Sequence, residues 1–433
     1  MHKTRSYSLI PAQAGNWFEG LRRVWREIPA YAGMSVILIC TLCLPAAAQD
    51  LFPLQPHPDG LEWPTEDWDV ANMPEDTAAS VNALITAAMA SEMADPVGET
   101  RAVIVIHKGR LVAETYRDGF GPETKQVSWS MAKSITQALV GRAVHLGLID
   151  DIDAPMPTPF APDDPRNVIT WRQWLNMTDG LDYKDFETTP FIETDVVQMM
   201  YGRGKYDFVD FIDRELPLKH EPGTRWFYST EGFHLLGWAL GQLIGDKDWA
   251  VNSVHMALSS DGAFEGLTAL NSPWGALRIW IHDEFFAPLG MDAQPEFDAA
   301  GTYLGGSLVW ASARDFAKFG YLYLRDGVWD SERLLPEGWV DFARTETPAE
   351  NSNVYGAGWW VTVQGETPTS FQSALTPPYD AFNANGNEGQ TIWVVPSRDL
   401  VIVRLGLMEN TEDNWGALFE WNQQIARAFP ELD

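Results

Sequence analysis

Cysteine is almost absent from this sequence of 433 residues. The two cysteines, Cys40 and Cys43, lie near the N-terminus, and none follows them. A chain trimmed of its first residues would therefore contain no disulfide and no thiolate metal site. The eight histidines are dispersed and form no H-E-x-x-H motif. This pattern disfavours a metalloenzyme, and we expect no metal and no cofactor.

Basic residues are also scarce, with 30 lysines and arginines against 60 acidic residues and a formal net charge of −30. Such a chain repels nucleic acid and anionic lipid, so we expect no nucleic-acid partner. The sequence has no G-x-S-x-G motif, which disfavours the strand-turn-helix nucleophile site of α/β-hydrolases. The oligomeric state stays open.

Long apolar runs are missing as well. The longest, Val36–Leu44, is too short to span a bilayer, and Pro45-Ala46-Ala47-Ala48 follows it as an A-x-A cleavage pattern. We interpret residues 1–48 as a signal peptide, Gln49 as the mature start, and the protein as periplasmic or secreted. The mature chain is not expected to insert stably in a membrane. Residues 1–33 contain a near-repeat and could be a spurious extension upstream of Met34.

The rest of the chain contains the patterns of an α+β protein. Residues 49–76 are rich in proline and read as an extended lead-in, and the alanine-rich stretch Thr77–Met93 has helical periodicity. Two hairpins are predicted at Arg101–Tyr116 and Thr391–Leu405, and a closing helix at Trp415–Phe429. The stretch Phe382–Gly389 is predicted to be a tight loop.

Strands therefore lie at both ends of residues 77–433, and helices lie between them. This order predicts one antiparallel sheet built from both termini, with a mostly helical region inserted. We assign residues 77–150 and 300–433 to the sheet part and residues 151–299 to the helical part. Residues 249–277 have little periodicity and are interpreted as an inserted loop or lid.

Ser130 and Lys133 form an S-x-x-K motif, and an apolar-periodic segment from Ile135 to Leu146 follows. The pattern predicts a helix that begins near Ser130, with both side chains on one face. A serine becomes a nucleophile when a base takes its proton, and a lysine whose pKa is lowered by burial can be that base. The alternative is that Ser130 is a plain helix cap, because a two-residue motif also arises by chance.

More landmarks follow in order, and together they are similar to a known family. They are Leu175–Leu181 (LNMTDGL), Pro222-Gly223-Thr224 before Tyr228-Ser229-Thr230, and Pro288–Met291 (PLGM). With S-x-x-K they resemble the serine beta-lactamase-related hydrolases. These include class C beta-lactamases, D-alanyl-D-alanine peptidases, family VIII esterases and 6-aminohexanoate-dimer hydrolases. The resemblance covers Arg101 to Leu405 and implies a beta-lactamase/transpeptidase-like fold.

The resemblance implies roles for individual residues. Ser130 matches the acyl-accepting nucleophile, and Lys133 matches the lysine that takes its proton. Tyr228 matches the tyrosine that works with the lysine and protonates the leaving group. Without the resemblance, Tyr228 reads as an ordinary core or rim tyrosine.

Two motifs depart from the family pattern. Thr230 stands where the family has an asparagine, and it cannot donate an amide N–H to a substrate carbonyl. Asn387-Glu388-Gly389-Gln390 stands where the family has K-T-G or H-x-G, so the usual cation is missing. By resemblance, Asn387 and Gly389 border the substrate and the N–H of Gln390 is the second oxyanion-hole donor. These changes disfavour strong beta-lactam hydrolysis.

The sequence therefore predicts a serine hydrolase that cleaves a small ester or amide through an acyl-enzyme on Ser130. Alternatives are a D-alanyl peptidase or penicillin-binding protein, a weak beta-lactamase, or an inactive homologue that only binds a ligand. The sequence does not name the substrate.

Overall fold

The computed structural model describes residues 51–184, 189–245, 273–352, 354–364, 373–374 and 376–432. The predicted signal peptide, Gln49 and most of the 249–277 segment lie outside these residues. Pro273–Ile281, at the end of that segment, is helix α8 rather than loop. Among the described helices, none combines the length and apolar character needed to cross a bilayer.

Along the described chain, most strands lie near the two ends, and α3 to α8 follow one another between them. The helices are α1 Glu75–Ala90, α2 Met131–His145, α3 Trp171–Leu175, α4 Asp195–Tyr201, α5 Phe208–Glu215, α6 Glu231–Gly245, α8 Pro273–Ile281, α9 Ala313–Leu324, α10 Trp339–Arg344 and α11 Glu412–Ala428. The strands are β1 Glu99–His107, β2 Arg110–Tyr116, β3 Gln126–Val127, β4 Gln294–Pro295, β5 Val309–Ala311, β6 Val328–Trp329, β7 Glu332–Arg333, β8 Trp360–Val361, β9 Val363–Gln364, β10 Ser373–Ala374, β11 Phe382–Gly386, β12 Gln390–Val395 and β13 Leu400–Leu407.

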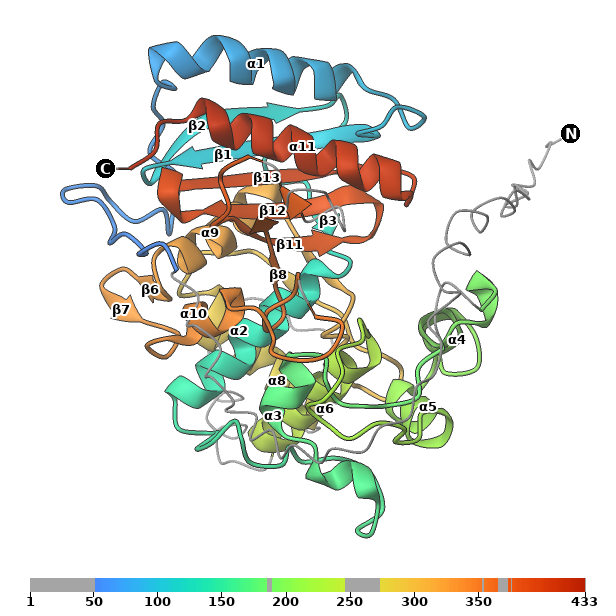
Figure 1. Ribbon diagram of the computed structural model, residues 1–433. Helices are drawn as coiled ribbons and strands as arrows, with labels where there is room; N and C mark the ends of the chain where they lie inside the picture. Colours follow the sequence, from blue (N-terminus) through green and yellow to red (C-terminus); the bar gives the residue numbers. More distant parts are fainter. Residues whose placement is uncertain are drawn as a thin grey trace, which may run out of the picture. The chain divides into compact units, whose positions relative to one another are not determined.

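One six-stranded sheet organises the domain, with the strand order β2-β1-β13-β12-β11-β8. The pairs are antiparallel, and β1 from the start of the domain lies against β13 from its end (Figure 1). The α+β fold with a sheet built from both termini is thereby confirmed. The hairpins predicted at Arg101–Tyr116 and Thr391–Leu405 are confirmed as β1–β2 and β12–β13.

Both faces of the central strands are buried, because alternate side chains point to opposite faces. Val103 and Val105 pack with α1 and α11, whereas Ile104 and Ile106 belong to the core on the other side. In Figure 1, α1 lies at the top of the domain and α11 crosses in front of the strands. Helix α9 contacts β1, β12 and β13 from the other face. Gly320 lets α9 approach closely, since a Cβ there would lie 2.7 Å from the side chain of Ile392.

Helix α2 runs through the core below the sheet and is buried from Met131 to Ala143. It contacts β11 on one side and α6 of the helical region on the other. The helix predicted from Ser130 is therefore confirmed, with Ser130 at its N-cap position. Because α2 lies at the junction of the two parts, its first turn faces residues from both.

The prediction of a loop at Phe382–Gly389 is wrong for its first five residues, which form β11. Asn383 and Asn385 have low strand propensity, but pairing with Trp393 and Thr391 of β12 outweighs it. The turn is limited to residues 387–389, in which Glu388 and Gly389 have φ values of 61° and 85°.

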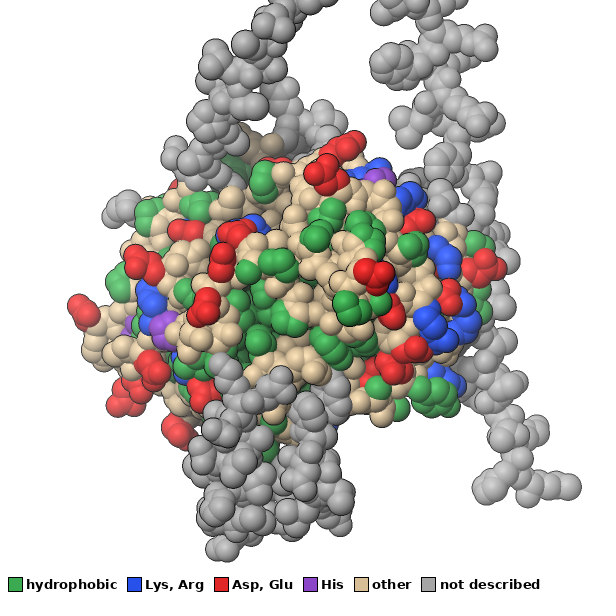
Figure 2. Space-filling model, turned by 90° about the horizontal axis from the view of Figure 1, so that it is seen from below, with side chains coloured by type: hydrophobic (Ala, Val, Ile, Leu, Met, Phe, Trp, Pro, Cys, Tyr) green, Lys and Arg blue, Asp and Glu red, His purple; other side chains and the backbone are tan. Residues whose placement is uncertain are grey.

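Acidic side chains are scattered on the face shown in Figure 2, among apolar and basic ones. On that face, the acidic side chains therefore form no single continuous patch.

Candidate active site

Ser130 lies on a sharp turn between β3 and α2. The turn is fixed to β5, because the N–H of Ser128 donates to the carbonyl of Val309 at 2.8 Å. Trp129, directly before the serine, has a φ of 44°, a conformation that costs a non-glycine residue about 1–3 kcal/mol and is concentrated at functional sites. Ser130 itself is half-exposed, so its hydroxyl is placed at the start of a helix within reach of solvent.

Lys133 lies one turn along α2 and is 1 % exposed. Its Nζ lies 3.0 Å from Oγ of Ser130, 3.1 Å from Oγ1 of Thr230 and 2.7 Å from the carbonyl oxygen of Gly306. Burial lowers the pKa of Lys133 to about 7, against the attraction of the Glu231 carboxylate. A neutral amine has two N–H donors and one lone pair. It can therefore donate to Thr230 and Gly306 and accept the hydroxyl proton of Ser130.

Tyr228 completes the group around Ser130. Its ring lies beneath Lys133, whose Nζ is 5.0 Å from the ring centroid. Burial raises the pKa of Tyr228 to about 12, and a hydrogen bond with Ser130 opposes part of the rise. Stacking on Trp360, with centroids 5.3 Å apart, holds the ring in place. At neutral pH the phenol is therefore protonated, which suits a proton donor better than a base.

Thr230, which the sequence also predicted as a site residue, lies beside Lys133. It is buried, and its hydroxyl contacts Lys133 from the start of α6. Threonine thus positions the lysine amine but offers no amide group to a substrate. The structure therefore brings together four of the predicted residues: Ser130, Lys133, Tyr228 and Thr230.

The residues of the predicted third motif lie in and beside the turn between β11 and β12. Gly389 is a turn residue between β11 and β12, and a Cβ on it would meet Arg404 inside the domain, 2.7 Å from Nη1. Gln390 is 2 % exposed, and its side chain exchanges two hydrogen bonds with the backbone of Gly406 on β13. Asn387 is exposed and bonded to Asn410.

The glycine that approaches the serine turn is Gly386, the last residue of β11. A Cβ there would lie 2.1 Å from the carbonyl oxygen of Ser128. The strand therefore meets the serine turn at Gly386 and not at Gly389, whose predicted place beside the substrate stays a prediction. The reason is that a three-residue hairpin turn needs glycine at its left-handed last position, and Gly389 fills it. Glu388 lies beside the serine turn and accepts the indole N–H of Trp129 at 3.3 Å.

Two buried titratable residues near Lys133 were not predicted as functional. Glu231, the first residue of α6, is 3 % exposed, and its Oε2 accepts the N–H of Thr230 at 2.9 Å. His234 accepts the N–H of Gly306 at 3.4 Å, and burial lowers its pKa well below the usual range, so its ring is neutral. The only sequence signal for Glu231 is an acidic residue directly after Tyr228-Ser229-Thr230.

No metal centre is apparent within the ranges that the structure describes, since no three His, Cys, Asp or Glu side chains are grouped to hold an ion.

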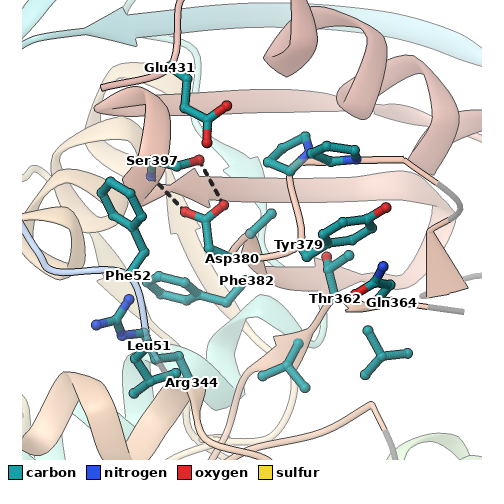
Figure 3. A pocket seen from close by; sticks show the side chains of 15 residues that line it. Leu51, Phe52, Arg344, Thr362, Gln364, Tyr379, Asp380, Phe382, Ser397 and Glu431 are labelled. Carbon is teal, nitrogen blue, oxygen red and sulfur yellow. Dashed lines mark hydrogen bonds between the residues drawn. The ribbon is translucent and has the colours of Figure 1, made fainter. Parts of the chain in front are cut away.

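A wider cavity of about 550 Å³ lies away from the serine, at the opposite end of β11 (Figure 3). Phe382, Tyr379, Asp380 and Arg344 are among its lining residues. Its charged groups already have partners, because Asp380 accepts from the N–H and hydroxyl of Ser397 and Arg344 bonds Asp341. Chemistry therefore points to the residues around Ser130 and not to this cavity.

Known proteins similar to this chain are found by both sequence and fold. A family model described as Beta-lactamase matches residues 82–253. The 6-aminohexanoate-dimer hydrolase of Paenarthrobacter ureafaciens is 25 % identical over 324 residues, which are 71 % of this chain and 72 % of that protein.

Solved structures show the same fold. A Bacillus anthracis protein that bears the name 6-aminohexanoate-dimer hydrolase has a TM-score of 0.59 at 19 % identity, over 87 % of this chain and 89 % of that one. EstCE1, described as a hydrolase with promiscuous acyltransferase activity, has a TM-score of 0.55 at 16 % identity, over 82 % and 98 % of the two chains. By partial family match and by fold, this chain is similar to the beta-lactamase-related hydrolases.

Proposed function

We propose that this protein is a serine hydrolase that cleaves a small ester or amide through an acyl-enzyme on Ser130. The observation that carries the proposal is the contact of 3.0 Å between Nζ of Lys133 and Oγ of Ser130. Burial lowers the pKa of that lysine to about 7, so a large fraction of it is unprotonated near neutral pH. A base with a pKa near the working pH is the most effective proton acceptor.

In acylation, Lys133 takes the hydroxyl proton while Oγ of Ser130 forms a bond to the substrate carbonyl carbon. The negative charge then rests on the carbonyl oxygen. Backbone N–H groups at the start of α2 and at the end of β11, near Gly386, are the donors that we propose for it. Losing one such donor typically costs an enzyme about 3 kcal/mol of transition-state stabilisation.

The leaving group departs as the bond from the carbonyl carbon breaks. Tyr228 supplies its proton and is reprotonated by the Lys133 ammonium, so the site returns to its starting charge. Water then attacks the acyl-enzyme by the reverse roles and releases the acid. A phenol whose pKa is raised to about 12 is a reluctant acid, and the ammonium 5.0 Å from its ring centroid assists by stabilising the phenolate.

A small linear amide is the substrate class that we propose, with small esters as further substrates. The curated relative is named for the hydrolysis of 6-aminohexanoate dimer. Beta-lactams are less suited to this site, because Glu388 places negative charge beside the serine turn and Thr230 lacks an amide. A D-alanyl peptide is the remaining alternative substrate.

The proposal is tested by a fluorophosphonate probe, with adducts measured by intact-protein mass. One adduct is expected on the wild type and none on Ser130→Ala. Lys133→Ala is expected to slow labelling by about 10²–10⁴-fold, the usual contribution of a general base. Ser134→Ala is the matched control, because Ser134 also lies on α2 but donates to the carbonyl of Gly358 at 2.6 Å.

A folded wild-type protein that remains unlabelled would support the inactive, ligand-binding alternative. For active protein, a panel of p-nitrophenyl acetate, nitrocefin, a D-alanyl-D-alanine peptide and 6-aminohexanoate dimer identifies the substrate class. Turnover of nitrocefin faster than of the ester and the linear amide would contradict the proposed substrate class.

A further inference from the structure

Glu231 is a buried carboxyl directly behind the catalytic pair. It is the first residue of α6, and its Oε2 accepts the backbone N–H of Thr230 at 2.9 Å. The hydroxyl of the same Thr230 lies 3.1 Å from Nζ of Lys133. One residue therefore separates the carboxyl of Glu231 from the amine that takes the serine proton.

The surroundings of Glu231 keep its charge unscreened. Its side chain lines a cavity of only about 10 Å³, together with Tyr228, Thr230 and Asp195, so bulk water has no room there. Charges separated from bulk water interact far more strongly than surface charges. The charged or titratable groups around Glu231 are Lys133 on α2, Asp179, Tyr183 and Lys184 after α3, Asp195 on α4, Tyr228 before α6 and His234 on α6.

Two of these groups pair with each other, although the charge of Asp195 still raises the pKa of Glu231. Asp195 accepts from Nζ of Lys184 at 3.0 Å and from its backbone N–H at 2.8 Å. His234 is neutral, since burial lowers its pKa well below the usual range. The cation whose charge acts on Glu231 is Lys133.

The charges of Glu231 and Lys133 each oppose the pKa shift that burial causes in the other residue. Burial raises the pKa of Glu231 to about 7, and the charge of Asp195 adds to the rise. Backbone hydrogen bonds and the charge of Lys133 act in the other direction. Burial lowers the pKa of Lys133 to about 7, and the charge of Glu231 opposes that fall. Without the carboxylate, Lys133 would therefore be an even weaker base.

We propose that Glu231 is a positioning residue that tunes the basicity of Lys133 through space. Its negative charge keeps the lysine basic enough to accept the proton of Ser130, although the amine is buried. The inference rests on the proposed function for its catalytic consequence, but the electrostatic coupling itself exists whether or not the protein is an enzyme.

The coupling is measured directly by titrating protein labelled with ¹³Cε-lysine, with the Lys133 signal assigned from its loss in Lys133→Met. Glu231→Gln removes the charge and keeps an oxygen for the N–H of Thr230. The midpoint of the Lys133 titration should fall by about one pH unit, because an opposite charge nearby shifts a pKa by one to three units. Glu231→Asp keeps a charge and should stay closer to the wild type.

Kinetics provide the second readout. In Glu231→Gln, the acid limb of the kcat/KM profile should move to lower pH by the same amount, and the plateau should fall because the amine is a weaker base. Asp182→Asn is the control, since Asp182 is about half-exposed and pairs with Lys219. It should leave both the midpoint and the profile unchanged.

An unchanged Lys133 midpoint in folded Glu231→Gln would overturn the inference, and so would an equal fall in Glu231→Asp. If Glu231→Gln does not fold, the wild-type Lys133 signal must show two inflections, its own and that of Glu231. A single inflection would then overturn it. A shifted midpoint in a protein that never labels at Ser130 would support the coupling and reject the proposed function.

Discussion

Gly386→Ala tests how tightly β11 holds the serine turn. Gly386 has φ −119° and ψ 150°, a backbone conformation open to any residue, so alanine adds only a methyl group. That Cβ would lie 2.1 Å from the carbonyl oxygen of Ser128 and 3.1 Å from Cβ of Trp129. Ordinary contact needs about 3.5 Å, so strand and turn must separate by more than about 1 Å.

The displacement reaches the nucleophile through one hydrogen bond. The carbonyl of Ser128 accepts the N–H of Met131 at 3.2 Å, and Ser130 lies between these two residues. A misplacement of about 1 Å can cost an enzyme about 100-fold in rate. We therefore expect kcat/KM for p-nitrophenyl acetate to fall about 100-fold, and overpacking to lower the free energy of unfolding by about 1–3 kcal/mol.

The assay combines initial rates with urea unfolding, and Gly416→Ala on α11 is the matched control. A Cβ on Gly416 meets nothing within 4 Å, so this variant should keep full activity and gain slightly in stability. Activity of Gly386→Ala within twofold of the wild type, at unchanged stability, would refute the close approach of β11 to the serine turn.

Two further predictions follow from other side chains. Tyr228→Phe should reduce hydrolysis of amides more than that of p-nitrophenyl esters, because an amide leaving group needs a proton. The measurement is kcat/KM for an ester and an amide of the same acid, and equal losses would contradict the donor role. Arg325→Ala should lower the free energy of unfolding by about 3–5 kcal/mol in urea, because it leaves Asp399 buried without its partner. Arg214→Ala, which breaks the exposed pair with Asp210, should cost less than about 1 kcal/mol, and equal costs would argue against burial as the cause.

The central pair could be predicted from sequence because its geometry is local. Ser130 and Lys133 lie one helical turn apart, and helical periodicity alone places them on one face. The hairpin at Arg101–Tyr116 was equally local, with Lys108 and Gly109 both at positive φ in its turn.

The glycine that approaches the serine turn could not be identified from sequence, because its position depends on hairpin register. From sequence alone, either Gly386 or Gly389 could be the glycine of the third motif. Only the pairing of Gly386 with Gln390 shows that Gly386 ends the strand. Glu231 was overlooked for a related reason. An acidic residue is usually exposed, and burial at the start of α6 depends on the packing of α2 and α3 against that helix.

The pairing of β1 with β13 has a consequence for how this domain is made. Glu99 lies opposite Leu407, and the hydroxyl of Thr77 on α1 donates to the carbonyl of Ala428 on α11 at 2.8 Å. Contacts between residues so distant in the sequence form slowly during folding. The central sheet also stays incomplete until the last strand has been synthesised. The same closeness of α1 and α11 makes the domain suited to circular permutation: a short linker could join these two helices, with new chain ends opened in a surface loop.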